Sequence, residues 1–260
     1  MRHADEAGPR RDCPTAPAPA IVPRMSSEGP GSSAGEAPSE EHAPRPPYRL
    51  RTARLEIRCY EPRDAPDLQA ALARNKAHLE PWIPWAHAEP TTVDAKLDRI
   101  LLFRSGFDRH EDYTYGIFDP DGGALVGGTG LHLRCGPGAA DIGYWIDAAR
   151  GGNGFAREAA VAMTRVGFEH LRLWRLEVRC DPANVRSAAI PQRLGFTEDG
   201  TLRARFQMHD GSRRDTRVFS MLDDEYATSP LRHATLVAYD ALGRELPPPP
   251  PPPPEQRDPS

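Results

Sequence analysis

The sequence predicts an α+β fold in which helices cover both faces of a mixed, mostly antiparallel sheet, a three-layer α/β/α arrangement. Segments that alternate apolar and polar residues recur between residues 113 and 147, with Gly- and Pro-containing turns between them, as in an antiparallel meander. A strand, a helix and a second strand then follow over residues 140–181, which makes the sheet mixed.

The elements follow from local patterns taken in order. Residues 54–60 ("RLEIRCY") alternate like a strand, and the segment after them carries proline near its start, as helices do. A proline-rich aromatic loop, "HLEPWIPWA" (78–86), separates this helix from the next. About seven strands are expected: 54–60, 113–119, 124–134, 140–147, 174–181 and a hairpin that turns at 209–212. About four helices are expected: 61–75, 92–109, one beginning near 154, and 184–194.

Both ends of the chain differ in composition from its centre. Residues 1–47 contain ten prolines and almost no large apolar residues, so we expect a disordered extension, within which Met25 is a second candidate start. Residues 247–254 are eight consecutive prolines, expected as an extended tail that could also dock an SH3-like partner. One weak helix is expected within 231–246. The predicted organisation is an extension (1–47), one domain (48–226) and a tail (227–260).

Composition excludes several function classes. No segment approaches the length of a membrane span and no apolar signal region opens the chain, so we expect a soluble, cytoplasmic protein. The four cysteines, at 13, 59, 135 and 180, form no C-x-x-C pair, and neither a metal site nor a disulfide framework is expected. The net charge of −4 gives no basic footprint for nucleic acid, and no G-K-[ST] motif for a P-loop occurs.

The stretch "ARGGNGFAREAA" (149–160) places three glycines at the start of a helix. Phe155, Ala159, Met163 and Val166 recur at helical spacing, so the helix begins near Gly154. Glycines in such a turn let several backbone N–H groups point outward together, and the helix dipole adds positive potential there. This pattern indicates an anion site, most naturally for phosphate. A tight strand-to-helix turn that binds nothing is the alternative.

Longer segments resemble a known family. "GYWIDAARGGNGFAREA" followed by "DPANVRSAAIPQRLGF", with "RLEIR" and "PWIPWA" upstream, is similar to the GCN5-related N-acetyltransferases (GNAT), and within them to the RimJ/RimL-like protein N-terminal acetyltransferases, over about 49–225. The resemblance implies a sheet that splays between its fourth and fifth strands to admit acetyl-CoA, with no metal. It also implies that backbone amides of the loop hold the cofactor's pyrophosphate: Gly151, Gly152, Asn153, Gly154, Phe155 and Ala156.

One loop position departs from the family pattern. Gly151 stands where the family commonly has Gln or Arg. Arg150 or Arg157 could supply the missing charge, or both could be solvated.

Acetyl transfer to an amine requires a base, donors for the carbonyl oxygen and a proton for the departing thiolate. The resemblance makes Asp141 the leading base, with Glu177 second and a water chain as the alternative. It implies carbonyl donors from the backbone N–H groups of Tyr144, Trp145 and Ile146, freed by a bulge in their strand.

The segment 184–194 carries the remaining candidates. Asn184 matches a cofactor-contacting asparagine of the family, but Asn before a helix is equally an N-cap. Pro191 stands where many members have a tyrosine acid, which leaves Ser187 as the local candidate to protonate the thiolate. Pro191 also leaves the Ser187 carbonyl without its usual i+4 amide.

The acceptor is expected against Trp82 and Trp85 of the proline-rich loop and Arg203 and Arg205 of the last hairpin, although Trp85 is also a candidate for ordinary core. The subgroup implies a protein N-terminal α-amine as acceptor. A small amine, such as an antibiotic or metabolite, and a catalytically silent acyl-CoA-binding module are the alternatives. A homodimer is left open.

Overall fold

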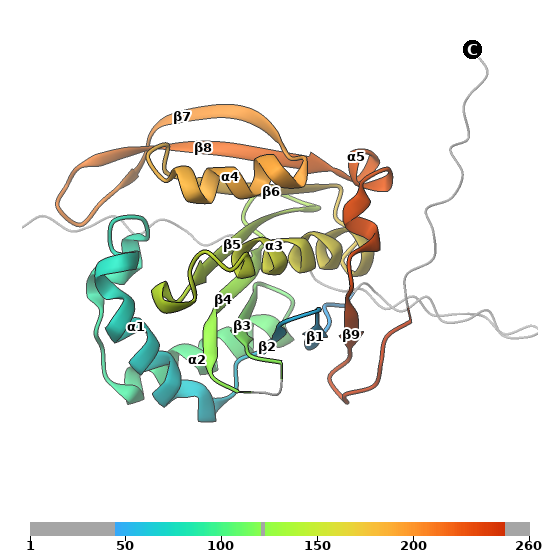
Figure 1. Cartoon of the computed structure of the whole chain (residues 1–260). Coiled ribbons are helices and arrows are strands. Elements are labelled where there is room, and N and C mark those ends of the chain that lie inside the picture. The colour runs from blue at the N-terminus through green and yellow to red at the C-terminus, as the bar shows by residue number, and fades with distance from the viewer. Residues whose placement is uncertain (1–44, 121–122, 248–260) are drawn as a thin grey trace, which may run out of the picture. The chain divides into compact units, whose positions relative to one another are not determined.

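The computed structural model describes residues 45–120 and 123–247. Within them nine strands form one sheet in the order β7-β8-β6-β5-β4-β3-β2-β1-β9 (Figure 1). Every neighbouring pair is antiparallel except β5 and β6, which run parallel. The strands are β1 (Arg49–Arg51), β2 (Glu56–Cys59), β3 (Tyr113–Phe118), β4 (Leu125–His132), β5 (Ala139–Ile146), β6 (Arg175–Cys180), β7 (Thr197–Gln207), β8 (Arg213–Leu222) and β9 (Val237–Tyr239). The mixed, mostly antiparallel α+β fold is confirmed, with β1 and β9 in addition to the seven predicted strands.

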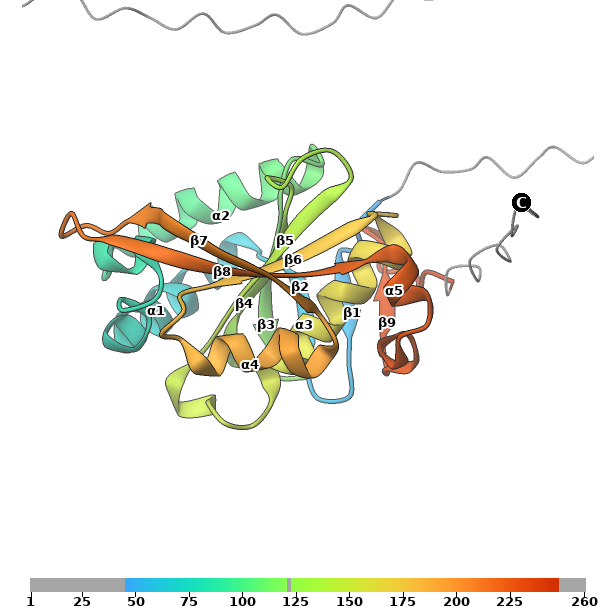
Figure 2. The ribbon, with the colours of Figure 1, turned by 90° about the horizontal axis from the view of Figure 1, so that it is seen from above.

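Five α-helices accompany the described sheet: α1 (Ala65–Leu79), α2 (Val93–Asp108), α3 (Phe155–Arg165), α4 (Val185–Leu194) and α5 (Asp223–Ala227). Helices α3 and α4 cover one face, and α2 lies over the opposite face (Figures 1 and 2). A single π-helical turn, Val166–His170, continues α3. The helix α3 is the crossover between the parallel strands β5 and β6, so its N-terminus lies where β5 ends.

Two apolar clusters fill the spaces on the sheet. The larger joins the buried face of α3, including Ala159, Met163 and Val166, to the central strands. The smaller packs α1 and the Ile100 side of α2 against Tyr60 and Phe118, with Trp145 of β5 at its margin. Residues of α1 and α2 therefore cover the face of β5 that carries Trp145.

The segment after residue 230 differs from the prediction. In place of a helix over 231–246, a short 3-10 turn (Pro230–His233) leads to β9, which pairs with β1. The expected helix is wrong because the free edge of β1 offers a ladder of backbone partners, and pairing with that edge outweighs the weak helical propensity of this segment.

Ordered packing also begins before residue 48. Pro46 and Pro47 are buried, and the buried Tyr115 hydroxyl donates to the Pro47 carbonyl at 2.9 Å. The predicted extension up to residue 44, with Met25, and the prolines from 248 onward lie outside the described residues. Among the helices that are described, none is both long and apolar enough to cross a membrane.

Candidate active site

The strands β5 and β6 diverge soon after they meet. Their parallel pairing covers three rungs, of which Asp141 opposite Glu177 is the last. Strand β5 continues to Ile146 and β6 to Cys180 without pairing to each other. The predicted splay is therefore present between the strands labelled β5 and β6, because β1 shifts the count by one.

The Gly-rich loop follows β5 and ends at α3. Gly152 (φ +81°) and Gly154 (φ +80°) both adopt the left-handed conformation that side chains disfavour. A Cβ at Gly152 would have no neighbour within 4 Å, so this backbone faces open space. In the described part of the chain, the backbone N–H groups of residues 152–157 make no hydrogen bond, and Glu158 is the first to donate into the helix. The loop therefore offers an anion a run of unpaired donors at a helix N-terminus.

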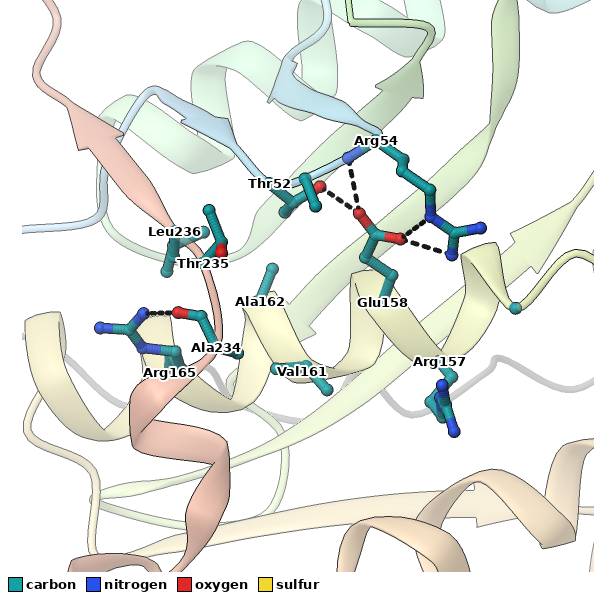
Figure 3. A pocket seen from close by; sticks show the side chains of 12 residues that line it. Thr52, Arg54, Arg157, Glu158, Val161, Ala162, Arg165, Ala234, Thr235 and Leu236 are labelled. Carbon is teal, nitrogen blue, oxygen red and sulfur yellow. Dashed lines mark hydrogen bonds and ion pairs between the residues drawn. The ribbon is translucent and has the colours of Figure 1, made fainter.

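Other elements hold this loop in place. Glu158 accepts from the Thr52 hydroxyl at 2.6 Å and from the Arg54 Nε at 2.8 Å (Figure 3). Arg54 also donates to the Asn153 carbonyl at 2.9 Å, which fixes the loop from the β1–β2 turn. On the other side, Asn75 of α1 accepts from the Ala148 N–H at 2.8 Å. The loop is therefore braced from both flanks before any ligand binds.

The two arginines expected near the loop have different surroundings. Arg150 forms an ion pair with Asp119 at 2.8 Å, so its charge is already matched by a carboxylate. Arg157 is exposed in the first turn of α3 and lines a cavity of about 210 Å³ together with Arg54 (Figure 3). This cavity lies between α3, the 52–54 turn and residues 234–236, whereas the splay lies at β5 and β6.

Tyr144 and Ser187 meet across the splay. The Tyr144 hydroxyl donates to the Ser187 carbonyl at 3.2 Å and lies 3.3 Å from the Ser187 Oγ. That carbonyl is the one that Pro191, inside α4, leaves without a helical donor. The pKa of Tyr144 is raised, mainly by burial, so its hydroxyl stays protonated at neutral pH. Asn184 uses its Oδ1 to accept from the Ser187 N–H at 3.1 Å, the N-cap geometry.

Asp141 and Glu177 lie in a cluster of arginines. Both oxygens of the buried Asp141 carboxylate accept from Arg134, each at 2.7 Å. Burial raises the pKa of Glu177, but hydrogen bonds from Arg175 and Arg179 outweigh it and leave that pKa lowered. The pKa lowering makes Glu177 a weak base.

A thiol lies beside the two carboxylates. The Cys135 Sγ is 3.7 Å from an oxygen of Asp141 and 3.7 Å from one of Glu177. Burial and the charge of Asp141 raise the pKa of Cys135 to about 12, which keeps it a neutral thiol.

The two faces of β5 carry different groups. Side chains alternate along a strand, so Asp141 and Trp145 share the face toward α1 and α2, whereas Tyr144 faces α4. Backbone N–H groups alternate as well. The Asp147 N–H donates to Val126 of β4, so by alternation the Trp145 N–H faces β4, and those of Tyr144 and Ile146 face the side that β6 leaves.

The expected bulge in β5 is absent. The register between β4 and β5 runs without a shift from Gly127 opposite Ile146 to His132 opposite Asp141. Any freed amides of β5 therefore come from the divergence of β6 and not from a bulge.

The predicted acceptor residues are all at the surface. Trp82 and Trp85 are 38% and 48% exposed, which rules out the core alternative for Trp85. Arg203 and Arg205 are exposed on β7. The hairpin contacts the loop, since Arg214 donates to the Pro81 carbonyl at 2.7 Å.

Two functional groups were not predicted from the sequence. From the sequence, only the backbone N–H of Tyr144 is expected to act, although Pro191 removes a helical donor and leaves the Ser187 carbonyl open to another one. From the sequence, Arg54 is expected only as part of a strand, because no local pattern connects it to Asn153, 99 residues away.

Known proteins are similar to this chain in sequence and in fold. Residues 54–197 match the family model described as an acetyltransferase (GNAT) domain. The ribosomal protein uS5-alanine N-acetyltransferase of Escherichia coli (strain K12) is 31% identical over 175 residues, covering 65% of this chain and 88% of the relative.

Solved structures of acetyltransferases have a similar fold. RimJ of Mycobacterium smegmatis in complex with CoA-disulfide is 26% identical, with a TM-score of 0.63, and the match covers 72% of this chain and 92% of that one. The ribosomal-protein-S5-alanine acetyltransferase from Vibrio fischeri, at 22% identity and a TM-score of 0.62 over 68% and 98% of the two chains, shares the fold. Because the family model spans more than half of the chain and the splayed sheet agrees with it, this protein belongs to the GNAT acetyltransferase family.

Proposed function

We propose that this acetyltransferase binds acetyl-CoA at the loop before α3 and transfers the acetyl group to the N-terminal α-amine of a protein. The observation that carries the proposal is the run of unpaired N–H groups over residues 152–157, located where β5 and β6 separate. The similarity to the Escherichia coli relative, an alanine N-acetyltransferase of ribosomal protein uS5, supports the acceptor class.

The loop fits a pyrophosphate. A phosphate oxygen can approach the backbone at Gly152 because no side chain stands there and none lies within 4 Å of its Cβ position. The dipole of α3 and the exposed Arg157 add favourable potential for negative charge. Acetyl-CoA supplies the thioester-bound acetyl group, and the chain supplies binding, orientation and proton transfer.

In this proposal the amine and the thiolate lie on opposite faces of β5. Asp141, on the face toward α1 and α2, takes the ammonium proton, and the Tyr144–Ser187 pair on the other face protonates the thiolate. The N–H groups of Tyr144 and Ile146 stabilise negative charge on the carbonyl oxygen.

The role of Asp141 has a pH test. Asp141→Asn is expected to lower kcat, with partial recovery at high pH, where the amine deprotonates unaided. A pH-independent loss would contradict its role as the base.

A peptide acceptor suits the surface around the proline-rich loop. Trp82 and Trp85 offer rigid aromatic contact area, and the prolines beside them restrict the backbone. The contact between Arg214 and Pro81 holds the hairpin beside this loop, so an extended acceptor would meet both segments.

The test is acetyl-CoA turnover against a panel of N-terminal peptides and small amines. We expect peptides to give the higher kcat/KM, and Trp85→Ala to raise the peptide KM without changing the KM for acetyl-CoA. Leu242→Ala is the control, because Leu242 is 75% exposed in a turn outside the site. Faster turnover of small amines would replace the protein acceptor by a small one, and binding without turnover would indicate a silent module.

A further inference from the structure

Three residues with metal-binding side chains converge at the tip of the β7–β8 hairpin. Glu80 follows the last residue of α1, His87 belongs to the 3-10 turn Pro84–Ala88, and His209 lies in the turn between β7 and β8. Their potential ligand atoms all lie within 4.8 Å of one another. The cluster therefore joins the segment after α1, which carries Glu80 and His87, to the β7–β8 turn, which is far from it in sequence.

The contacts within this cluster are close. The His87 Nδ1 is 3.2 Å from the Glu80 Oε1, and the rings of His87 and His209 stack with centroids 3.5 Å apart and an angle of 9° between their planes. The hydrogen bond from Arg214 to Pro81 fastens the same hairpin to the same loop. The hydrogen bond from Arg214 therefore helps the ring stacking to hold His209 close to His87.

Charged side chains of both signs lie around the cluster. Lys76 is 3.6 Å from the Glu80 Oε1, but its ammonium donates to the His87 carbonyl at 2.7 Å. Asp210, next to His209, adds a second carboxylate, which accepts from the Ser212 hydroxyl at 2.6 Å. Two carboxylates, Glu80 and Asp210, are thus matched by two cations, Lys76 and Arg214, and each cation already donates to a backbone carbonyl.

We propose that Glu80, His87 and His209 form a binding site for a divalent transition-metal cation of the zinc class. Imidazole nitrogen and carboxylate oxygen are ligands that such ions prefer, and three protein ligands leave a fourth position for water. Two nitrogen ligands disfavour Mg²⁺ and Ca²⁺, which bind oxygen.

The geometry needs only small side-chain movements. With metal–ligand bonds of about 2.0–2.2 Å, tetrahedral ligand atoms lie roughly 3.3–3.6 Å apart. The Glu80–His87 pair is already near this separation. The in-plane lone pairs of two parallel rings do not converge, so His209 must tilt out of the stack, and its exposed position on a turn leaves space to do so.

The cation would fasten the hairpin to the proline-rich loop. The proposed function places these two segments beside the acceptor. A cation bound at this site would therefore fix the distance between the hairpin and the proline-rich loop. The site itself does not depend on that function, because cation binding is measured without acetyl-CoA or an amine.

Calorimetric titration of the untagged full-length chain with Zn²⁺ tests the site. We expect one Zn²⁺ per chain, removed by a chelator, and affinities at least about 10- to 100-fold weaker in His209→Gln, His87→Gln and Glu80→Gln. His78→Gln is the matched control, since His78 is an exposed histidine near the end of α1 outside the cluster.

A second measurement reports on the hairpin. Zn²⁺ should slow backbone hydrogen exchange around residues 207–213 in the unaltered chain and in His78→Gln, but not in His209→Gln. Absence of Zn²⁺ binding to the unaltered chain, or equal binding by the three ligand variants, would overturn the proposal.

Discussion

At the Ser187 carbonyl, a hydroxyl replaces a missing helical N–H. Pro191 cannot donate, and the Tyr144 hydroxyl reaches the same oxygen at 3.2 Å from β5. One hydrogen bond thus ties α4 to β5 where β6 has moved away. The contact also places a phenol and the Ser187 hydroxyl together on the face proposed for thiolate departure.

Substitutions at this pair should separate stability from chemistry. Ser187→Ala keeps the hydrogen bond from the Tyr144 hydroxyl to the carbonyl of residue 187, so we expect normal stability. We also expect an unchanged KM for acetyl-CoA and a kcat lower by about 10²-fold, the low end for a positioned proton donor. Tyr144→Phe should also cost about 1 kcal/mol of unfolding free energy, because the Ser187 carbonyl loses its donor. Steady-state kinetics and urea unfolding measure both effects.

The double variant provides the control. Two groups that act as one donor should show losses in kcat that do not multiply. Full kcat in Ser187→Ala would leave the Tyr144 hydroxyl as the donor, and full kcat in the double variant would leave bulk water as the proton source.

Glu177 has a pH signature of its own. Its pKa lies below the usual 4.5 because Arg175 and Arg179 overcome burial, so the carboxylate stabilises the folded state fully above pH 4.5 and loses that contribution as pH falls through its folded pKa. Glu177→Gln should therefore be less stable than the unaltered chain at neutral pH, with the difference shrinking in acid. Urea unfolding at a series of pH values measures it, and a pH-independent difference would show that packing alone is at work.

At the scale of the elements, the turn into α3 is the part of the site that the sequence predicts best. Its glycines and the spacing of Phe155, Ala159 and Met163 are local signals, and the helix begins at Phe155 as they indicate. The bracing of this turn by Arg54 and Asn75 depends on chain segments far away, which no local pattern reports.

Gly152 offers a clean test of this turn. Gly152→Ala introduces a Cβ into open space at φ +81°, so it should cost about 1 kcal/mol of stability through backbone strain and also weaken acetyl-CoA binding. Gly243→Ala is the matched control, since Gly243 has φ +76° and equally open surroundings in the turn after β9. Calorimetry should show weaker cofactor binding only in Gly152→Ala; equal affinities would refute the phosphate assignment.

The edge strands and the ion pairs show why other predictions failed. Three residues such as Val237–Tyr239 are too few for a recognisable alternation, and their strand exists only because β1 lies beside them. The surroundings of Asp141 likewise depend on Arg134 from the far end of a turn and on the β6 partner Glu177. Residue types at the site were predictable, but their partners were set by the tertiary fold.

At the scale of the whole molecule, the proposed reaction is centred on the place where two strands of the sheet separate. Only the β5–β6 pair in the described sheet is parallel, and it is also the pair that opens. The helix connecting these strands has the unpaired N–H groups at its N-terminus, so one crossover places the proposed phosphate donors beside the opening.

The boundary of the folded unit can be located by truncation. A chain that begins at residue 45 keeps the Pro47 carbonyl, whereas one that begins at 48 leaves the buried Tyr115 hydroxyl without its acceptor. The shorter chain should lose about 1–3 kcal/mol of unfolding free energy, and the longer one should retain it. Equal denaturation midpoints for the two chains would show that water replaces the carbonyl.

The pairing of β9 with β1 determines how the protein responds to mechanical force. Arg49 and Tyr239 form the same rung, and after Tyr239 the chain turns back along β9, where Glu245 bridges to Tyr239 and the Leu246 N–H donates to the Ala238 carbonyl. Tension applied between these two residues loads the rungs one after another, beginning at that pair, instead of shearing them together. A molecular machine that pulls on the C-terminal side would first detach residues 245–246 from β9 and then peel β9 from β1, before it reached the strands around the candidate site.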